Sequence, residues 1–182
     1  VTQANSVTGS VAAGSTFSTG NDQFAFSFGS GDPAVTVTSI EIDLRAGDDT
    51  NAIFDTSGRN SYGPALGTLD GLSAGDVTFS PASGQTDSPV LTIDFADGSF
   101  GVGDTLRFGV DTDDLGGDNG ADFASRGVAF TVTFSDGSVV STTYGGDGAS
   151  GSVATVSVES AVDGAVVSGL GGDDVLIGTD LD

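Results

Sequence analysis

Several amino acids are missing from this chain of 182 residues: it contains no cysteine, histidine, methionine or tryptophan, and its only basic residues are four arginines. Without cysteine, the chain has no disulfide, iron–sulfur or thiolate site. Without histidine it has no Ser-His-Asp triad, and a zinc or copper centre is disfavoured. No apolar run reaches the roughly 18 residues of a transmembrane helix, so no insertion into a membrane is predicted.

Positive charge is scarce and negative charge is abundant: 26 acidic residues against 4 basic ones give a formal net charge of -22. Because phosphate binding needs a positive surface, nucleic acid is excluded as a partner, and an anionic membrane is disfavoured. All but two of the acids are aspartate, the exceptions being Glu41 and Glu159. Aspartate favours turns and is a common calcium ligand. Calcium binding and adaptation to salt or solubility both explain this bias, and the two can coexist.

Helical periodicity is also missing, whereas alternation of apolar and polar residues is frequent. In Gln23–Phe28, three phenylalanines fall on one face of an extended strand. In Val35–Leu44 the alternation shifts by one residue, which predicts a β-bulge near Ser39. The same alternation predicts further strands at Val90–Phe95, Thr105–Val110, Val128–Phe134 and Ser152–Val158.

Turns of the Asp-Gly type separate these strands. Asp136–Gly137 is a strong signal for a two-residue β-hairpin, and Asp97–Gly98 gives the same signal. The pattern predicts an all-β fold of two packed antiparallel sheets, a β-sandwich or jelly-roll, with the twelve phenylalanines between them. We expect residues 1–20 to form an N-terminal arm or an edge strand, residues 21–167 the sandwich, and residues 168–182 a separate tail.

The tail, SGLGGDDVLIGTDLD, combines glycine and aspartate with one apolar triplet. The pattern G-G-x-G-x-D-x-U-x, in which U is a large apolar residue, has five fixed positions, of which Gly169, Gly172, Asp174 and Leu176 match four. Leu170 stands where the second glycine would be. This segment resembles the RTX repeat, the glycine- and aspartate-rich calcium-binding nonapeptide of secreted bacterial proteins.

The RTX resemblance implies a location and an ion. Proteins with such tails are exported by Gram-negative bacteria and fold outside the cell, where calcium is plentiful. They include adhesins, surface-layer proteins, toxins and polysaccharide-degrading enzymes. By this resemblance the chain is expected to be secreted or at the cell surface, in a marine or saline setting, and to bind Ca²⁺ through residues that include Asp173 and Asp174. The rest of the chain looks in a general way like the β-sandwich modules found beside RTX repeats.

An acidic segment, Gly109–Asp122, is the first candidate site outside the tail. Counted from Asp111, it has acids at positions 1, 3 and 12, glycine at 6 and asparagine at 9, which resembles the calcium loop of EF-hand proteins. Leu115 occupies position 5, where a ligand is usual, and no flanking helices are predicted. The segment is either a calcium site or an acidic hairpin loop. The predicted ligands are Asp111, Asp113, Asp118, Asn119 and Asp122.

A second candidate is Arg45–Gly63, which brings carboxylate, amide, guanidinium and aromatic side chains together. Such a mixture binds sugar hydroxyls, either directly or through calcium. The alternative is a long polar loop with internal salt bridges. The predicted carbohydrate-binding residues are Asp48, Asp49, Asn51, Asp55, Arg59, Asn60 and Tyr62.

The function that these features favour is a non-catalytic, extracellular, calcium-binding β-sandwich module that binds carbohydrate. A first alternative is a structural subunit of a surface layer, filament or adhesin stalk, whose partners are neighbouring copies of the chain. A second alternative is a polysaccharide-active enzyme with two catalytic carboxylates. The enzyme is disfavoured because the chain has no tryptophan and only two tyrosines to form a sugar-stacking cleft.

Overall fold

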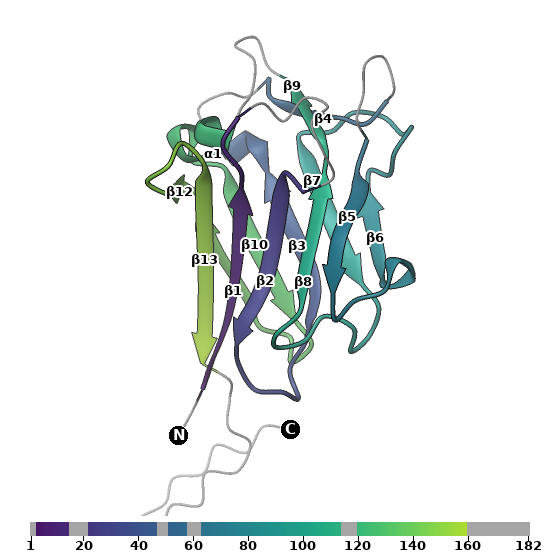
Figure 1. Cartoon of the computed structure of the whole chain (residues 1–182), viewed down its shortest axis with the longest axis vertical. Helices are drawn as coiled ribbons and strands as arrows, with labels where there is room; N and C mark the ends of the chain where they lie inside the picture. Colours follow the sequence, from purple (N-terminus) through teal and green to yellow (C-terminus); the bar gives the residue numbers. More distant parts are fainter. Residues whose placement is uncertain (1–2, 15–21, 47–50, 58–62, 114–119, 160–182) are drawn as a thin grey trace, which may run out of the picture.

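The computed structural model describes residues 3–14, 22–46, 51–57, 63–113 and 120–159. These residues form two antiparallel sheets that pack face to face, with a short two-stranded ribbon at one end (Figure 1). The arrangement confirms the β-sandwich that the apolar–polar alternation predicts.

The first sheet has six strands in the order β12-β13-β1-β2-β8-β5. Each strand pairs antiparallel with its neighbours. The strands are β1 (Ala4–Val11), β2 (Phe24–Ser30), β5 (Ala65–Asp70), β8 (Thr105–Gly109), β12 (Gly145–Gly146) and β13 (Ser152–Glu159).

The second sheet has five strands in the order β11-β10-β3-β7-β6, again all antiparallel. They are β3 (Val37–Asp43), β6 (Val77–Ser80), β7 (Val90–Phe95), β10 (Ala129–Phe134) and β11 (Val139–Thr143). Single 3₁₀ turns follow β3 at Leu44–Ala46 and precede β6 at Ala74–Asp76.

Phenylalanine fills the space between the sheets, as the sequence predicts. Among the phenylalanines that the structure describes, all but Phe79 are buried. Phe26 of the first sheet meets Phe130 of the second with ring centroids 5.6 Å apart, and Phe24 stacks on Phe108 at 5.0 Å. The predicted bulge is also confirmed, because the pairing of β10 with β3 skips Thr38 between Val37 and Ser39.

Two predicted details are wrong. β1 is not an edge strand: it lies between β13 and β2 and pairs with both, so the backbone groups along both of its edges are hydrogen-bonded. Asp136–Gly137 does form the β10–β11 hairpin, but Asp97–Gly98 does not form one. A turn is present at Asp97–Gly98, but the next strand, β8, belongs to the other sheet and does not pair with β7. The Asp-Gly sequence favours a reversal of the chain direction, but it does not determine which strand the next strand pairs with.

A short helix that the sequence analysis did not predict, α1 (Gly120–Arg126), follows the acidic segment. The ring of its Phe123 packs in T-shaped geometry against the rings of Phe24 and Tyr144, with centroids 5.6 and 5.7 Å apart. A helix this short is not stable through helical propensity alone, so the packing of Phe123 into the core stabilises it.

The two-stranded ribbon consists of β4 (Ile53–Asp55) and β9 (Asp111–Asp113). Only Val110, which is fully buried, separates β9 from β8. The ribbon is therefore a direct extension of a core strand beyond the end of the sandwich, at the end of the molecule where α1 also lies (Figure 1).

Candidate metal centre

Three aspartates converge on the β4–β9 ribbon: Asp55, Asp111 and Asp113. Asp111 and Asp113 are two residues apart on β9, so their side chains leave the strand on the same side. Asp55 is the direct cross-strand partner of Asp111. As a result, one carboxylate oxygen of each residue lies within 4.8 Å of the others. The strand pairing itself thus creates the cluster.

The cluster is partly removed from water. Asp55 is 7% exposed and Asp111 is 3% exposed, whereas Asp113 is exposed. Burial, together with the charges of Asp113 and Asp55, raises the pKa of Asp111 to about 6. Burial and the neighbouring acids also raise the pKa of Asp55. Like charges directly opposite one another destabilise a strand pair, so the ribbon favours a bound proton or cation here.

A fourth carboxylate, Asp87, holds the end of β4. One of its oxygens accepts hydrogen bonds from the backbone N–H groups of Thr56 at 2.9 Å and Ser57 at 2.8 Å. The other accepts the Ser57 hydroxyl at 3.1 Å. Although burial opposes it, these hydrogen bonds lower the pKa of Asp87, which therefore stays ionised beside Asp55. Asp87 orients the cluster and adds to its negative potential.

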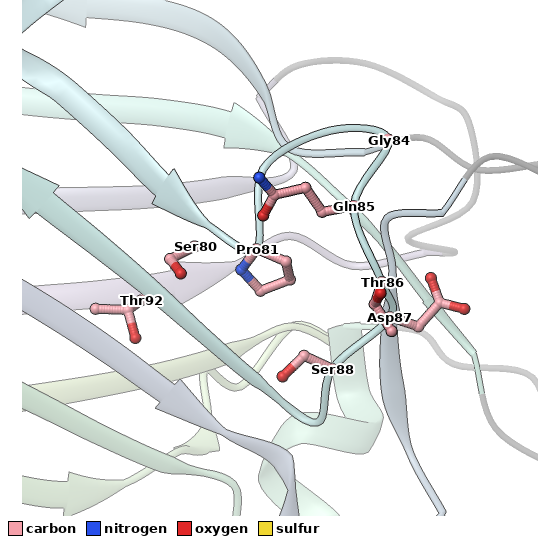
Figure 2. A pocket seen from close by; sticks show the side chains of 8 residues that line it. All are labelled: Ser80, Pro81, Gly84, Gln85, Thr86, Asp87, Ser88 and Thr92. Atoms are coloured by element: carbon pink, nitrogen blue, oxygen red, sulfur yellow. The ribbon is translucent and has the colours of Figure 1, made fainter.

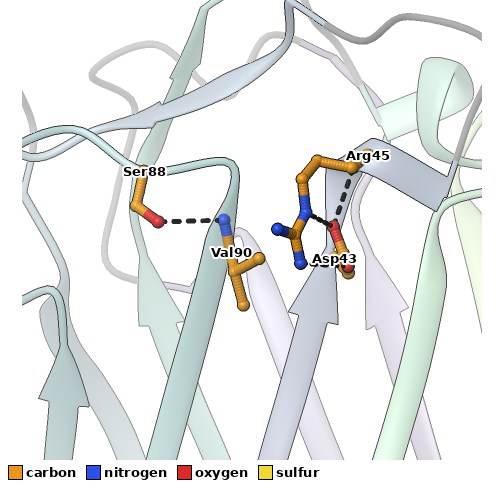
Figure 3. Close-up of polar contacts among 4 residues, drawn as sticks. All are labelled: Asp43, Arg45, Ser88 and Val90. Carbon is orange, nitrogen blue, oxygen red and sulfur yellow. Dashed lines mark hydrogen bonds and ion pairs between the residues drawn. The ribbon is translucent and has the colours of Figure 1, made fainter.

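The segment that carries Asp87 is itself tied to β4. Phe54 and Ser88 exchange both backbone hydrogen bonds, with N–O distances of 2.8 and 3.3 Å. The Thr56 hydroxyl donates to the carbonyl oxygens of Gln85 and Thr86. The Ser88 hydroxyl oxygen accepts the Val90 N–H at 3.1 Å, at the start of β7 (Figure 3). The ribbon is thus anchored to the second sheet as well as to the first.

The donor set suits a hard cation. Ca²⁺ binds six to eight oxygen ligands at about 2.3–2.6 Å, so two ligands of one ion lie at most about 5 Å apart. The three aspartates satisfy this limit. They are all oxygen donors, and the chain contains no histidine or cysteine to bind a softer metal. The residues present therefore fit calcium, with carbonyl oxygens or water completing the coordination.

The structure unites residues from both predicted sites. Asp111 and Asp113 come from the acidic segment, and Asp55 comes from the stretch assigned to carbohydrate. Asp122 lies on α1 and is not a member of this group. Asn51 is exposed just before β4. Asp48, Asp49, Arg59, Asn60, Tyr62, Asp118, Asn119, Asp173 and Asp174 lie outside the described residues.

Arg45, at the start of the predicted carbohydrate stretch, forms an ion pair with Asp43 on the adjoining strand (Figure 3). The guanidinium Nε and a terminal nitrogen donate to the two carboxylate oxygens at 2.9 and 2.8 Å. The Arg45 hydrogen bond lowers the pKa of Asp43 against the effect of its burial. The pair joins this stretch to β3 and leaves both interpretations of the stretch open.

Asp87 is not among the ligands predicted from the sequence. The only signal for it is the run of Thr86, Asp87 and Ser88 immediately before a strand, which is ordinary turn composition. Its role depends on contacts with Thr56 and Ser57, about 30 residues away in the chain. No local pattern encodes a contact of that kind.

Comparison with known proteins adds no relative: no protein-family model matches the chain, and no match is found among curated proteins or solved structures. Within the described part of the chain, no helix is both long and apolar enough to cross a membrane.

Proposed function

We propose that this chain is a calcium-binding β-sandwich module that acts by binding and not by catalysis. The observation that carries the proposal is the convergence of Asp55, Asp111 and Asp113 across one strand pair, two of them buried. An arrangement of like charges that opposes pairing of the ribbon becomes favourable when a divalent cation joins the three carboxylates.

Calcium suits this ribbon better than magnesium. Magnesium requires a near-ideal octahedron at about 2.0–2.1 Å and gives up its water reluctantly, whereas calcium accepts irregular oxygen sets. The three carboxylates come from two strands whose backbone geometry is fixed by hydrogen bonds. That pairing sets the directions from which the carboxylates approach an ion, and calcium accepts an irregular set of directions more readily.

We place the module outside the cell, or on its surface. The RTX-like tail supports this, because the repeat that it resembles belongs to proteins that meet calcium only after export. The net charge of -22 also supports it, since strong acidity suits a salt-rich medium. With an affinity typical of extracellular modules, roughly 10⁻⁴–10⁻³ M, such a site fills outside the cell and not in the cytosol.

Carbohydrate is the partner that we favour. A β-sandwich offers loop ends for recognition, and the segment that contains Gln85, Thr86 and Ser88 is hydrogen-bonded to β4 and the residue after it, beside the acidic cluster. Self-assembly into a surface layer or filament is the alternative. An enzyme is the weaker alternative, because a glycosidase needs its two carboxylates in a cleft that holds the sugar ring.

Calorimetric titration of calcium tests the metal proposal. The double variant Asp111→Asn with Asp113→Asn keeps the size of both side chains and removes two ligand charges. We expect it to lose measurable calcium binding. The matched control is Asp70→Asn with Asp94→Asn, which makes the same change of net charge at two exposed aspartates outside the cluster. Equal calcium affinity in both double variants would overturn the assignment.

A further inference from the structure

A polar depression lies beside the cluster, at the edge of the second sheet. It has a volume of about 690 Å³ and lies between the end of β6, the start of β7 and the segment that joins them. This volume is in the range of sites that hold small ligands, roughly 300–1,000 Å³. Neither predicted site includes any residue that lines it.

The floor of the depression is the outer surface of the sheet. Ser80 of β6 and Thr92 of β7 are direct cross-strand partners there. The next partner along the same row is Glu41 of β3, whose carboxylate is therefore on the same face beside Thr92. The wall is the β6–β7 connection, which carries Gln85, Thr86 and Ser88 (Figure 2).

Several lining groups are free to bind a ligand with defined geometry. The Gln85 side-chain oxygen accepts the Ala82 N–H at 3.1 Å, which fixes the orientation of the amide. Its NH₂ group is not used in this bond and can donate to a ligand. The Ser88 hydroxyl oxygen accepts the Val90 N–H, so its own hydrogen can be donated. Thr92 has a stiff β-branched side chain, and Ser80 is its short neighbour.

The chemistry of the lining selects a neutral ligand rich in hydroxyl groups. Among the described lining residues, none is basic and none is aromatic. Asp87 is the only acid, and its carboxylate is turned away toward Thr56 and Ser57, which occupy it (Figure 2). An anionic sugar meets no basic side chain among these lining residues and is repelled by the net charge of -22. A sugar hydroxyl, in contrast, can accept from the Gln85 NH₂ group and can both donate to and accept from serine and threonine hydroxyls.

We propose that this depression, at the β6–β7 edge, binds a neutral saccharide through Ser80, Gln85, Thr86, Ser88 and Thr92. The inference rests on the proposed carbohydrate partner. It places the binding site on the outer face of the second sheet and not in the predicted stretch Arg45–Gly63. The wall is linked to the acidic cluster, because the Gly84 N–H donates to the Thr56 carbonyl at 2.6 Å and the Thr56 hydroxyl donates to the Gln85 carbonyl. A cation at Asp55 therefore also orders the wall.

Nuclear magnetic resonance of the ¹⁵N-labelled protein tests the site with maltotetraose, mannotetraose and an anionic alginate tetrasaccharide. In calcium we expect at least one neutral saccharide to shift the amide resonances of Gln85, Thr86, Ser88 and Thr92. The alginate fragment is expected to leave them unchanged. Absence of such shifts with both neutral saccharides, or shifts with alginate alone, would overturn the proposal.

A matched pair of variants separates the site from the rest of the sheet. Ser80→Ala with Thr92→Val removes both floor hydroxyls and keeps strand-compatible shapes. The control is Ser141→Ala with Thr131→Val, which changes another cross-strand Ser–Thr pair, at the opposite edge of the same sheet. We expect the first variant to bind the saccharide at least tenfold more weakly and the control to bind as the unaltered chain does. Equal loss in the two variants would refute the site.

Calcium titration of the same samples distinguishes this inference from the metal proposal. Calcium binding without saccharide shifts would reject the depression as a site and leave the metal centre standing. Saccharide shifts without calcium binding would reject the metal centre and leave the depression standing.

Discussion

The ionisation of Asp111 depends strongly on the fold. Its pKa of about 6 in the folded chain lies above the ordinary value of 3.8. A raised carboxyl pKa means that the folded state binds the proton more tightly than the unfolded state does. The stabilising effect of that proton is complete below about pH 3.8 and is lost as the pH rises through about 6.

We predict that the calcium-free protein becomes more stable as the pH falls from 7.5 to 5, with the Asp111 contribution on the order of 2 kcal/mol. Urea unfolding at both pH values measures it. Asp111→Asn should remove this part of the pH dependence, because asparagine does not titrate. The result against the prediction is the same pH dependence in the variant and in the unaltered chain.

Gly9 is required by close packing between the sheets. A Cβ atom at this position would lie 2.8 Å from the Phe130 ring and 2.9 Å from the Phe26 ring, closer than real side chains approach. Both rings are fully buried and cannot move aside freely. We predict that Gly9→Ala destabilises the fold by about 1–3 kcal/mol.

Gly29→Ala is the control for that change. It introduces the same methyl group on the neighbouring strand, where the nearest atom is the Ser6 carbonyl oxygen at 4.0 Å. Urea unfolding should show a small effect at Gly29 and a large one at Gly9. Similar losses at the two positions would contradict the packing argument.

The β4–β9 ribbon depends on an element that is remote in the sequence. Asp87 accepts the Thr56 and Ser57 N–H groups and the Ser57 hydroxyl. Removing the acceptor leaves the buried Thr56 N–H without this bond, at a cost of roughly 1–3 kcal/mol. The Ser57 N–H keeps only its longer hydrogen bond to Asp55 at 3.3 Å. We predict that Asp87→Ala speeds amide hydrogen exchange at Thr56 and Ser57, while Asp87→Asn, which keeps one acceptor oxygen, has a weaker effect.

Asp136→Ala is the control for the ribbon. Asp136 accepts the N–H and the hydroxyl of Ser138 at 2.9 and 2.6 Å in the β10–β11 turn, a similar capping arrangement. Its loss should loosen Ser138 and leave Thr56 and Ser57 protected. If Asp87→Ala leaves exchange at Thr56 and Ser57 unchanged, then Asp87 is not the anchor of β4.

The elements also differ in how far the sequence predicts them. Period-two alternation identified β2, β3 and β13, because each buries one face between the sheets and the pattern is a direct consequence. The three residues of β4 are too few to show a period. The pairing of β4 with β9 depends on how the whole sandwich brings the strand ends together, so the sequence predicted Asp111 and Asp113 as ligands and assigned Asp55 elsewhere.

At the scale of the whole molecule, the described aspartates occur in two arrangements. Several aspartates cap turns: Asp32, Asp136 and Asp147 each accept the N–H two residues ahead, at 2.9, 2.9 and 2.6 Å. The cluster at the ribbon adds a different arrangement, in which three carboxylates face one another across one strand pair. Turn chemistry therefore accounts for part of the aspartate excess, and a cation is proposed for the cluster alone.

The net charge of -22 makes two kinds of salt effect separable. Exposed charges repel over distances that salt screens, with a Debye length of about 10 Å at 0.1 M, so sodium chloride should raise the melting temperature without a specific site. A bound ion stabilises by RT ln(1 + [L]/Kd), roughly 2.7 kcal/mol at a hundredfold excess over Kd. For a domain of this size each kcal/mol corresponds to about 2–4 °C.

We therefore predict that calcium at about a hundredfold excess over its Kd raises the melting temperature by roughly 5–10 °C over chelator at matched ionic strength. Magnesium should give less, because it fits the ribbon poorly. The double variant Asp111→Asn with Asp113→Asn should lose the calcium increment and keep the increment from sodium chloride, since its other acids still repel. If the variant keeps the calcium increment, the ion stabilises the chain elsewhere, or only by screening its charge.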